Sequence, residues 1–150
     1  QARLSIEARG GGAPREAALR LERAIALAPE VTLYRYDLAN LLWDASSAAS
    51  GQGRVLILER AKEAAREGVR ARPLDAQAHR LRALAALRGE EGGVSQDAEA
   101  LAAARRALEL DPNGGLTLET FILAARRNRE EAAARAAEER LARITRGTAP

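Results

Sequence analysis

Three stretches of the chain end in the same way, and this repetition restricts the possible folds more than any other feature. Each of three prolines follows an alanine-rich stretch in which small or apolar residues stand twelve, eight and five positions earlier. These residues are Ala17, Leu21 and Ala24 before Pro29, then Ala61, Ala65 and Gly68 before Pro73, and finally Ala100, Ala104 and Ala107 before Pro112. Intervals of four and three place the residues on one helical face. A proline then prevents the helix from continuing. The pattern predicts a repeat unit that ends in a helix.

The composition favours helices that pack closely together. The 150 residues are 47% hydrophobic, and aromatic residues account for only 3%. Alanine, which supplies much of the apolar content, is the strongest helix former and adds little volume. Small residues on a repeated face let a neighbouring helix approach. We therefore expect an all-helical chain without a β-sheet.

At this point the sequence resembles the tetratricopeptide repeat (TPR) family, whose unit of about 34 residues is a pair of antiparallel helices with an A-x3-F…P second half. The segments "LYRYDLANLLW" and "LTLETFILAA" match the family's first helix in part. The matching residues are Leu38, Ala39 and Leu42 in the former, and Leu118, Phe121, Ile122 and Ala125 in the latter. A third segment, "DAQAHRLRALAALRG", aligns through Ala78, Leu81 and Ala85.

The resemblance implies one domain over residues 1–150, a right-handed α-solenoid of antiparallel helix pairs with about seven to eight helices. The expected pairs are 1–29, 30–73, 74–112 and 113–146. The prolines are 44 and 39 residues apart, and we assign the surplus to inter-helix loops at 44–54 and 89–97. Asp75 and Ser95 are expected to cap the N-termini of the helices that follow them.

The first nine residues fit the tail of a truncated first helix. Because the chain also lacks an initial methionine, we expect it to be a fragment of a longer chain. A truncated first pair would leave an apolar stacking face uncovered, so we expect some self-association at that end.

Residues that carry chemistry are sparse. The chain has no cysteine, and His79 is its single histidine. Most carboxylates stand three or four residues from an arginine, a spacing that stabilises helices. The glycine-rich stretches lack the ending of a phosphate-binding loop. We expect no enzymatic activity, cofactor or metal. No apolar run approaches the roughly 20 residues of a membrane span, so we expect a soluble domain, with cytoplasm and periplasm both open.

In the family that this chain resembles, the first helices line a concave groove. Matched by register, the partner-binding residues are Leu33, Tyr36, Asn40, Trp43, His79, Glu119, Leu123 and Arg126, together with Ala83 and Leu116. Tyr36, Asn40 and Trp43 share one stripe of a helix. Two interpretations of Trp43 remain open, since it either faces the groove or packs in the core beneath the 44–53 insertion. For Asn40 the groove is favoured, because a core position would bury an unpaired amide.

A second surface is rich in arginine. Residues 66–88 contain Arg66, Arg70, Arg72, Arg80, Arg82 and Arg88, against two carboxylates. If these arginines cluster, they form a site for an anionic partner. Helical geometry spreads them over several faces, and no aromatic residues alternate with them for base stacking. We therefore favour a solvated surface and do not expect nucleic acid.

The leading hypothesis is a non-enzymatic scaffold that binds a peptide or a partner domain in its groove. An alternative is an accessory module of a larger enzyme or membrane protein, such as a bacterial glycan polymerase or ligase, where similar repeats occur. A weaker alternative is binding of nucleic acid or another anionic surface by the arginines.

Overall fold

The computed structural model describes residues 13–88 and 94–147. Within these ranges the chain forms seven α-helices and no β-strand. The helices are α1 (Ala13–Leu27), α2 (Thr32–Ser47), α3 (Gly51–Ala71), α4 (Ala76–Arg88), α5 (Val94–Leu110), α6 (Gly115–Arg127) and α7 (Glu131–Thr145). The expectation of an all-helical chain is confirmed. The predicted truncated helix over residues 1–9 lies outside the described residues.

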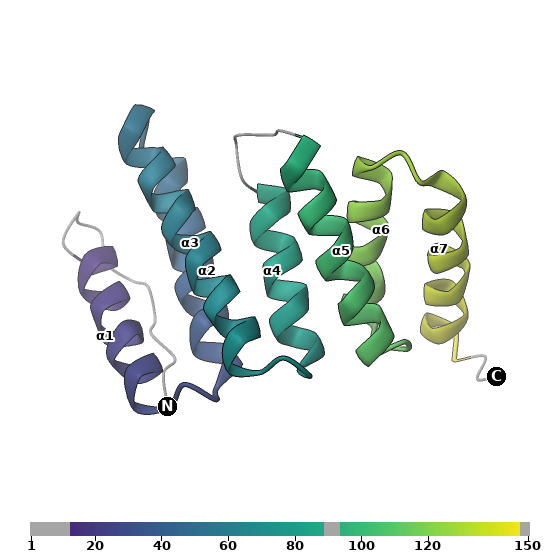
Figure 1. The fold of residues 1–150 in the computed structure, drawn as a ribbon, viewed down its shortest axis with the longest axis horizontal. Coiled ribbons are helices and arrows are strands. Elements are labelled where there is room, and N and C mark those ends of the chain that lie inside the picture. The colour runs from purple at the N-terminus through teal and green to yellow at the C-terminus, as the bar shows by residue number, and fades with distance from the viewer. Residues whose placement is uncertain (1–12, 89–93, 148–150) are drawn as a thin grey trace.

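The helices stand side by side in a row, with α1 and α7 at opposite ends (Figure 1). Each helix packs against the next, from α1 with α2 to α6 with α7. Beyond these sequential contacts, α4 also contacts α2 and α6. Among the described residues, the odd-numbered helices do not contact one another in this way.

These contacts define two layers of helices that differ in how closely their members pack. Helices α2, α4 and α6 form one layer whose members touch. Helices α1, α3, α5 and α7 form the other layer, whose members are joined by side-chain ion pairs, Arg60 with Glu22 and Arg66 with Glu99, but do not pack closely against one another. A row of helices that is closer together on one side curves toward that side. The layer of α2, α4 and α6 is therefore the inner one, and we call its outward surface the inner face.

The prolines set the register of the repeat. Helices α1, α3 and α5 each end two residues before a proline, and α2, α4 and α6 each begin three residues after one. Two buried side chains fasten these turns. A guanidinium nitrogen of Arg35 donates to the carbonyl oxygen of Pro29. Nε2 of His79 donates to the carbonyl oxygen of Pro73 at 2.7 Å. Both residues stand six positions after their proline, where α6 has Leu118.

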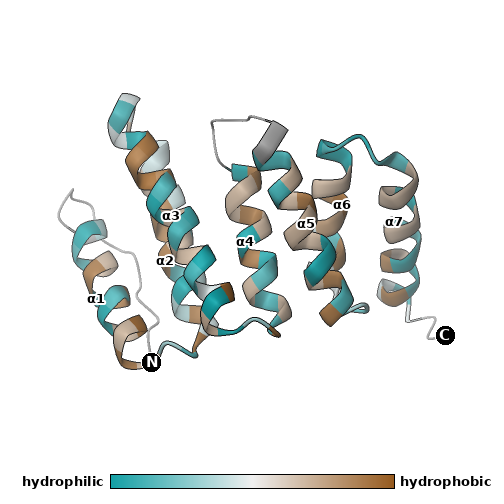
Figure 2. Cartoon of the chain, in the orientation of Figure 1, coloured by the Kyte–Doolittle hydropathy of each residue, from teal (hydrophilic) through white to brown (hydrophobic). Residues whose placement is uncertain are grey.

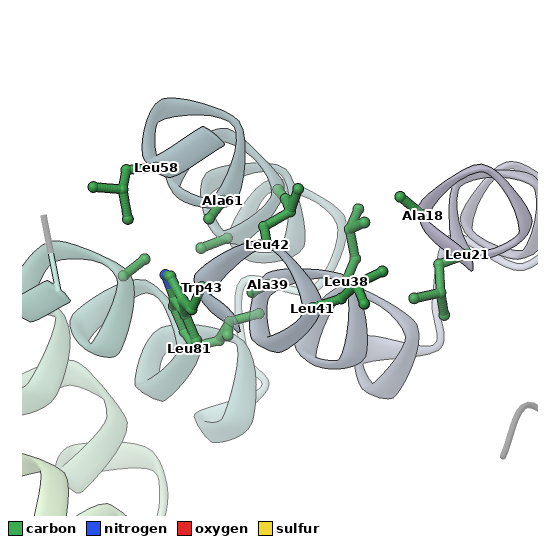
Figure 3. Packing of buried hydrophobic residues seen from close by; sticks show 13 residues of the cluster. Ala18, Leu21, Leu38, Ala39, Leu41, Leu42, Trp43, Leu58, Ala61 and Leu81 are labelled. Atoms are coloured by element: carbon green, nitrogen blue, oxygen red, sulfur yellow. The ribbon is translucent and has the colours of Figure 1, made fainter. Parts of the chain in front are cut away.

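The core consists of two clusters built from small residues and leucines. The first joins α1 to α4, and Trp43 lies beside Leu81 there (Figure 3). The second joins α4 to α7 and contains more alanine than leucine. Apolar and polar bands alternate along the helices (Figure 2), and α2 and α4, which have neighbours on both sides, are buried around most of their circumference.

The small residues of the repeat allow this close packing. Ala61, Ala65, Ala100, Ala104 and Ala107 are each 0% exposed. Gly68 occupies the equivalent place in α3, and a Cβ atom there would lie 3.2 Å from Cδ of Arg35. Glycine at this position therefore leaves room for the arginine that fastens the preceding turn.

One of the two predicted caps is present. The backbone N–H of Gln77 donates to Oδ1 of Asp75 at 2.9 Å, and the hydroxyl of Thr32 donates to Oδ2 at 2.7 Å. Asp75 thus caps α4 and ties it to α2. Ser95 is not an N-cap, because α5 already begins at Val94. The long loop predicted for 44–54 is shorter, since α2 continues to Ser47 and α3 begins at Gly51.

Candidate partner-binding surface

The proline register identifies which residues the inner helices direct toward the inner face. Positions four, seven, eleven and fourteen after each proline share one stripe of a helix. On α2 these residues are Leu33, Tyr36, Asn40 and Trp43; on α4 they are Gln77, Arg80, Leu84 and Leu87; and on α6 they are Leu116, Glu119, Leu123 and Arg126. The three stripes differ in how far their side chains are already engaged within the chain.

Arginines from α4 cover the aromatic residues of α2. The guanidinium carbon of Arg80 lies 5.2 Å from the centre of the Tyr36 ring, and that of Arg88 lies 4.2 Å from the Trp43 ring. Trp43 is only 5% exposed and belongs to the first core cluster. The core reading of Trp43 is therefore the correct one. Tyr36 and Asn40 are half-buried, and Leu33 is exposed.

The predicted groove register of α4 is wrong by one residue. His79 is buried and bonded to the Pro73 carbonyl, while Ala83 is fully buried. Arg80 and Leu84 occupy the equivalent inner-face positions instead. Arg80 is itself 9% exposed, and its Nε donates to Oε1 of Gln77 at 2.8 Å. On the α4 stripe Arg80 is therefore covered, whereas Leu84 and Leu87 are half-buried and Gln77 is exposed.

Helix α6 presents an open stripe. Leu116 and Leu123 are each 56% exposed, and Glu119 between them is also exposed. Arg126 is exposed but pairs with Glu138 of α7. The neighbouring Arg127 pairs with Asp97 of α5 at 3.4 Å. Two leucines and a carboxylate thus stay uncovered along α6, while the two arginines at its C-terminal end are paired with carboxylates of other helices.

The six arginines of the predicted anionic-partner patch are engaged one by one. Arg66 and Arg82 both contact the carboxylate of Glu99 at 3.3 Å. Arg70 pairs with Glu63 at 2.6 Å, and Arg72 donates to the carbonyl oxygen of Glu30 at 3.0 Å. Arg80 and Arg88 cover the two aromatic rings of α2. The structure therefore distributes these arginines among separate intramolecular contacts, and the anionic patch stays a prediction.

Two carboxylates depart from their ordinary titration. Burial raises the pKa of Asp37 on α2. Burial also acts to raise the pKa of Glu99, but hydrogen bonds and attraction from Arg66 and Arg82 outweigh it and lower that pKa. Glu99 is a structural link between three helices. Asp37, beside Tyr36, has no hydrogen-bond or ion-pair partner within the described part of the chain.

The helix patterns in the sequence did not predict that arginines of α4 stack on the aromatic rings of α2. The signal was present in the register, because Tyr36 and Arg80 both stand seven residues after a proline. Equivalent residues of successive first helices are neighbours in a solenoid. Once the prolines are aligned, an arginine beside a tyrosine is the expected contact.

Nothing in the described ranges gathers three or more metal-binding side chains. In the same ranges, no helix combines the length and apolar character needed to cross a bilayer.

The two layers, the helix pairs and the proline register define an all-α, TPR-like solenoid. Solved structures of MamA share this arrangement. "MamA RS-1 ArsTM double mutant" has a TM-score of 0.66 at 20% identity, over 91% of this chain and 68% of that one. "MamA MSR-1 C2" has a TM-score of 0.59 at 17% identity, over 92% and 71%. "MamA 41-end from Desulfovibrio magneticus RS-1" has a TM-score of 0.58 at 19% identity, over 90% and 66%.

The likeness to these structures confirms the predicted fold class, a right-handed α-solenoid of antiparallel helix pairs. No protein-family model and no curated protein matches the sequence. At these levels of identity the likeness concerns the fold.

Proposed function

We propose that the chain is a protein-interaction scaffold whose inner face binds a segment of a partner protein, with α6 as the main contact. The observation that carries this proposal is the open stripe of α6. Leu116 and Leu123 lie seven residues apart on one side of the helix, and each is more than half exposed. Burial of apolar surface of this kind is a main driving force of association between proteins.

The other end of the inner face supports the same function in a smaller role. Leu33 is 61% exposed, and Asn40 is half-buried without a hydrogen-bond partner in the described residues. Tyr36 is partly covered by Arg80 and offers less free surface. We therefore assign most of the binding energy to Leu116 and Leu123, and a lesser contribution to Leu33 and Asn40.

The test is selection of binders from a phage-displayed library of random 16-residue peptides, followed by titration of the selected peptides. Leu116→Asp and Leu123→Asp should each weaken binding by about tenfold or more, because a buried leucine contributes about 1.5–3 kcal/mol. Leu56→Asp is the matched control, since Leu56 is 63% exposed on α3 of the outer layer. It should leave affinity unchanged, and circular dichroism should show the same helix content in every variant.

The proposal fails if the library yields no binder. It also fails if the selected peptides bind the two α6 variants as tightly as the original chain.

A further inference from the structure

The charge left free on the α6 stripe is acidic, although the chain as a whole has a net charge of +3. Glu119 has no hydrogen-bond or ion-pair partner among the described residues. The same holds for Asp37 and Asp44 on α2. Of these three carboxylates, only Glu119 lies within an inner-face stripe, because Asp37 and Asp44 each stand one residue beyond the α2 stripe.

The arginines of the inner layer are already engaged. Arg126 pairs with Glu138, and Arg127 pairs with Asp97. Arg80 is 9% exposed beneath the inner face, stacked against Tyr36. Arg88 lies over Trp43. An acidic partner segment would have to displace these contacts, whereas a basic one would find unpaired carboxylates.

The α6 stripe also sets the spacing of a complementary segment. Leu116, Glu119 and Leu123 follow one another at intervals of three and four, which is two turns of helix in total. The two leucines are therefore about 10 Å apart along the axis at ~1.5 Å per residue. A second helix that runs alongside α6 matches this spacing with apolar residues seven apart and a charged residue between them.

From this arrangement we propose that the partner segment is a basic amphipathic α-helix. It carries a lysine or arginine between two apolar residues that are seven positions apart. The apolar residues pack on Leu116 and Leu123, and the cation pairs with Glu119. This inference rests on the function proposed above and adds the chemistry of the ligand to it.

The test reverses the charge of Glu119. Phage-displayed random 16-residue peptides are selected in parallel on the original chain, on Glu119→Lys and on Glu139→Lys. Glu139 is exposed on α7 in the outer layer, so its variant controls for the change in net charge. Peptides selected on the original chain should be enriched in Lys or Arg between two apolar residues. Selection on Glu119→Lys should enrich Asp or Glu at that position, and Glu139→Lys should leave the first preference intact.

Synthetic peptides give the quantitative form of the same test. For a selected basic peptide, replacement of the central cation by glutamate should weaken binding to the original chain about two- to fivefold, the range of an exposed ion pair. With Glu119→Lys the order of the two peptides should invert. Raising the salt concentration should reduce the difference.

The outcomes separate the two proposals. If the selected peptides depend on Leu116 and Leu123 but keep the same charge preference on Glu119→Lys, the basic-helix inference is overturned and the interaction scaffold stands. Acidic peptides selected on the original chain would overturn the inference in the same way. If binding ignores both leucines, the scaffold proposal fails first.

Discussion

The two ends of the inner layer differ in how far their inner-face side chains are covered by other residues of the chain. At α2 and α4, arginines cover the aromatic rings, and Trp43 is drawn into the core. At α6, Arg126 and Arg127 pair with carboxylates on α7 and α5. Leu116, Glu119 and Leu123 remain exposed to solvent. The first arrangement uses large side chains for stability. The second leaves apolar surface exposed, which favours binding. The difference predicts which end tolerates substitution.

The largest expected difference compares Trp43 with Leu123. Trp43→Ala should lower the free energy of unfolding by about 3–5 kcal/mol, because it leaves a large cavity in the first core cluster. Leu123→Ala, on the exposed stripe, should change it by no more than about 0.5 kcal/mol. Urea denaturation followed by circular dichroism measures both. Equal decreases in the free energy of unfolding would mean that Trp43 and Leu123 are buried to the same extent, which would contradict the comparison.

A smaller effect is expected at the turn that joins the second and third repeats. Asp75→Ala removes the cap of α4 and the hydrogen bond from Thr32, so the free energy of unfolding should fall by about 1–2 kcal/mol. Asp44→Ala is the control, since Asp44 is exposed and has no partner among the described residues. Helix α6 has no equivalent side-chain cap to remove, because its N-cap is Gly114, which makes no side-chain hydrogen bond. Urea denaturation of both variants measures the change in the free energy of unfolding, and equal changes for Asp75→Ala and Asp44→Ala would contradict the prediction.

The sequence predicted the outer helices better than the inner ones. In α3 and α5 the small residues stand in a fixed relation to a proline, and every predicted alanine is fully buried, with Ala64 and Ala103 buried beside them. Helix α4 gave no such contrast, because alanine, leucine and arginine alternate on nearly all its sides. Matching α4 to the family pattern through Leu81 and Ala85 therefore places the inner-face positions one residue too early in the sequence. Alignment from Pro73 gives the correct positions.

The inner face was predicted in part, for a related reason. Position in a repeat indicates that a side chain points inward, but a neighbouring repeat decides whether it is then covered. Leu123 and Glu119 are exposed, and no arginine within residues 13–88 and 94–147 pairs with Glu119. Tyr36 and Trp43 are covered by arginines that stand more than forty residues later in the sequence. Such contacts follow from the stacking geometry, which a single helix pattern does not contain.

The smallest expected effect concerns Glu99, which links α5 to Arg66 and Arg82. Because the folded-state pKa of Glu99 is lowered, its ionised form stabilises the fold above the unfolded pKa, near 4.5. As the pH falls below that value, the unfolded chain takes up the proton first, and the contribution is lost. Glu99→Gln should therefore cost about 0.2–1 kcal/mol at pH 7, the range of an ion pair that solvent still reaches, and less at pH 3.

Glu119→Gln is the matched substitution at the open end. Since Glu119 has no partner among the described residues, this variant should unfold at the same urea concentration as the original chain at both pH values. Denaturation of the two variants at pH 7 and pH 3 measures the difference. A pH-dependent loss in Glu119→Gln would show that its carboxylate is engaged within the fold, and a missing loss in Glu99→Gln would remove Glu99 from the contacts that hold α3, α4 and α5 together.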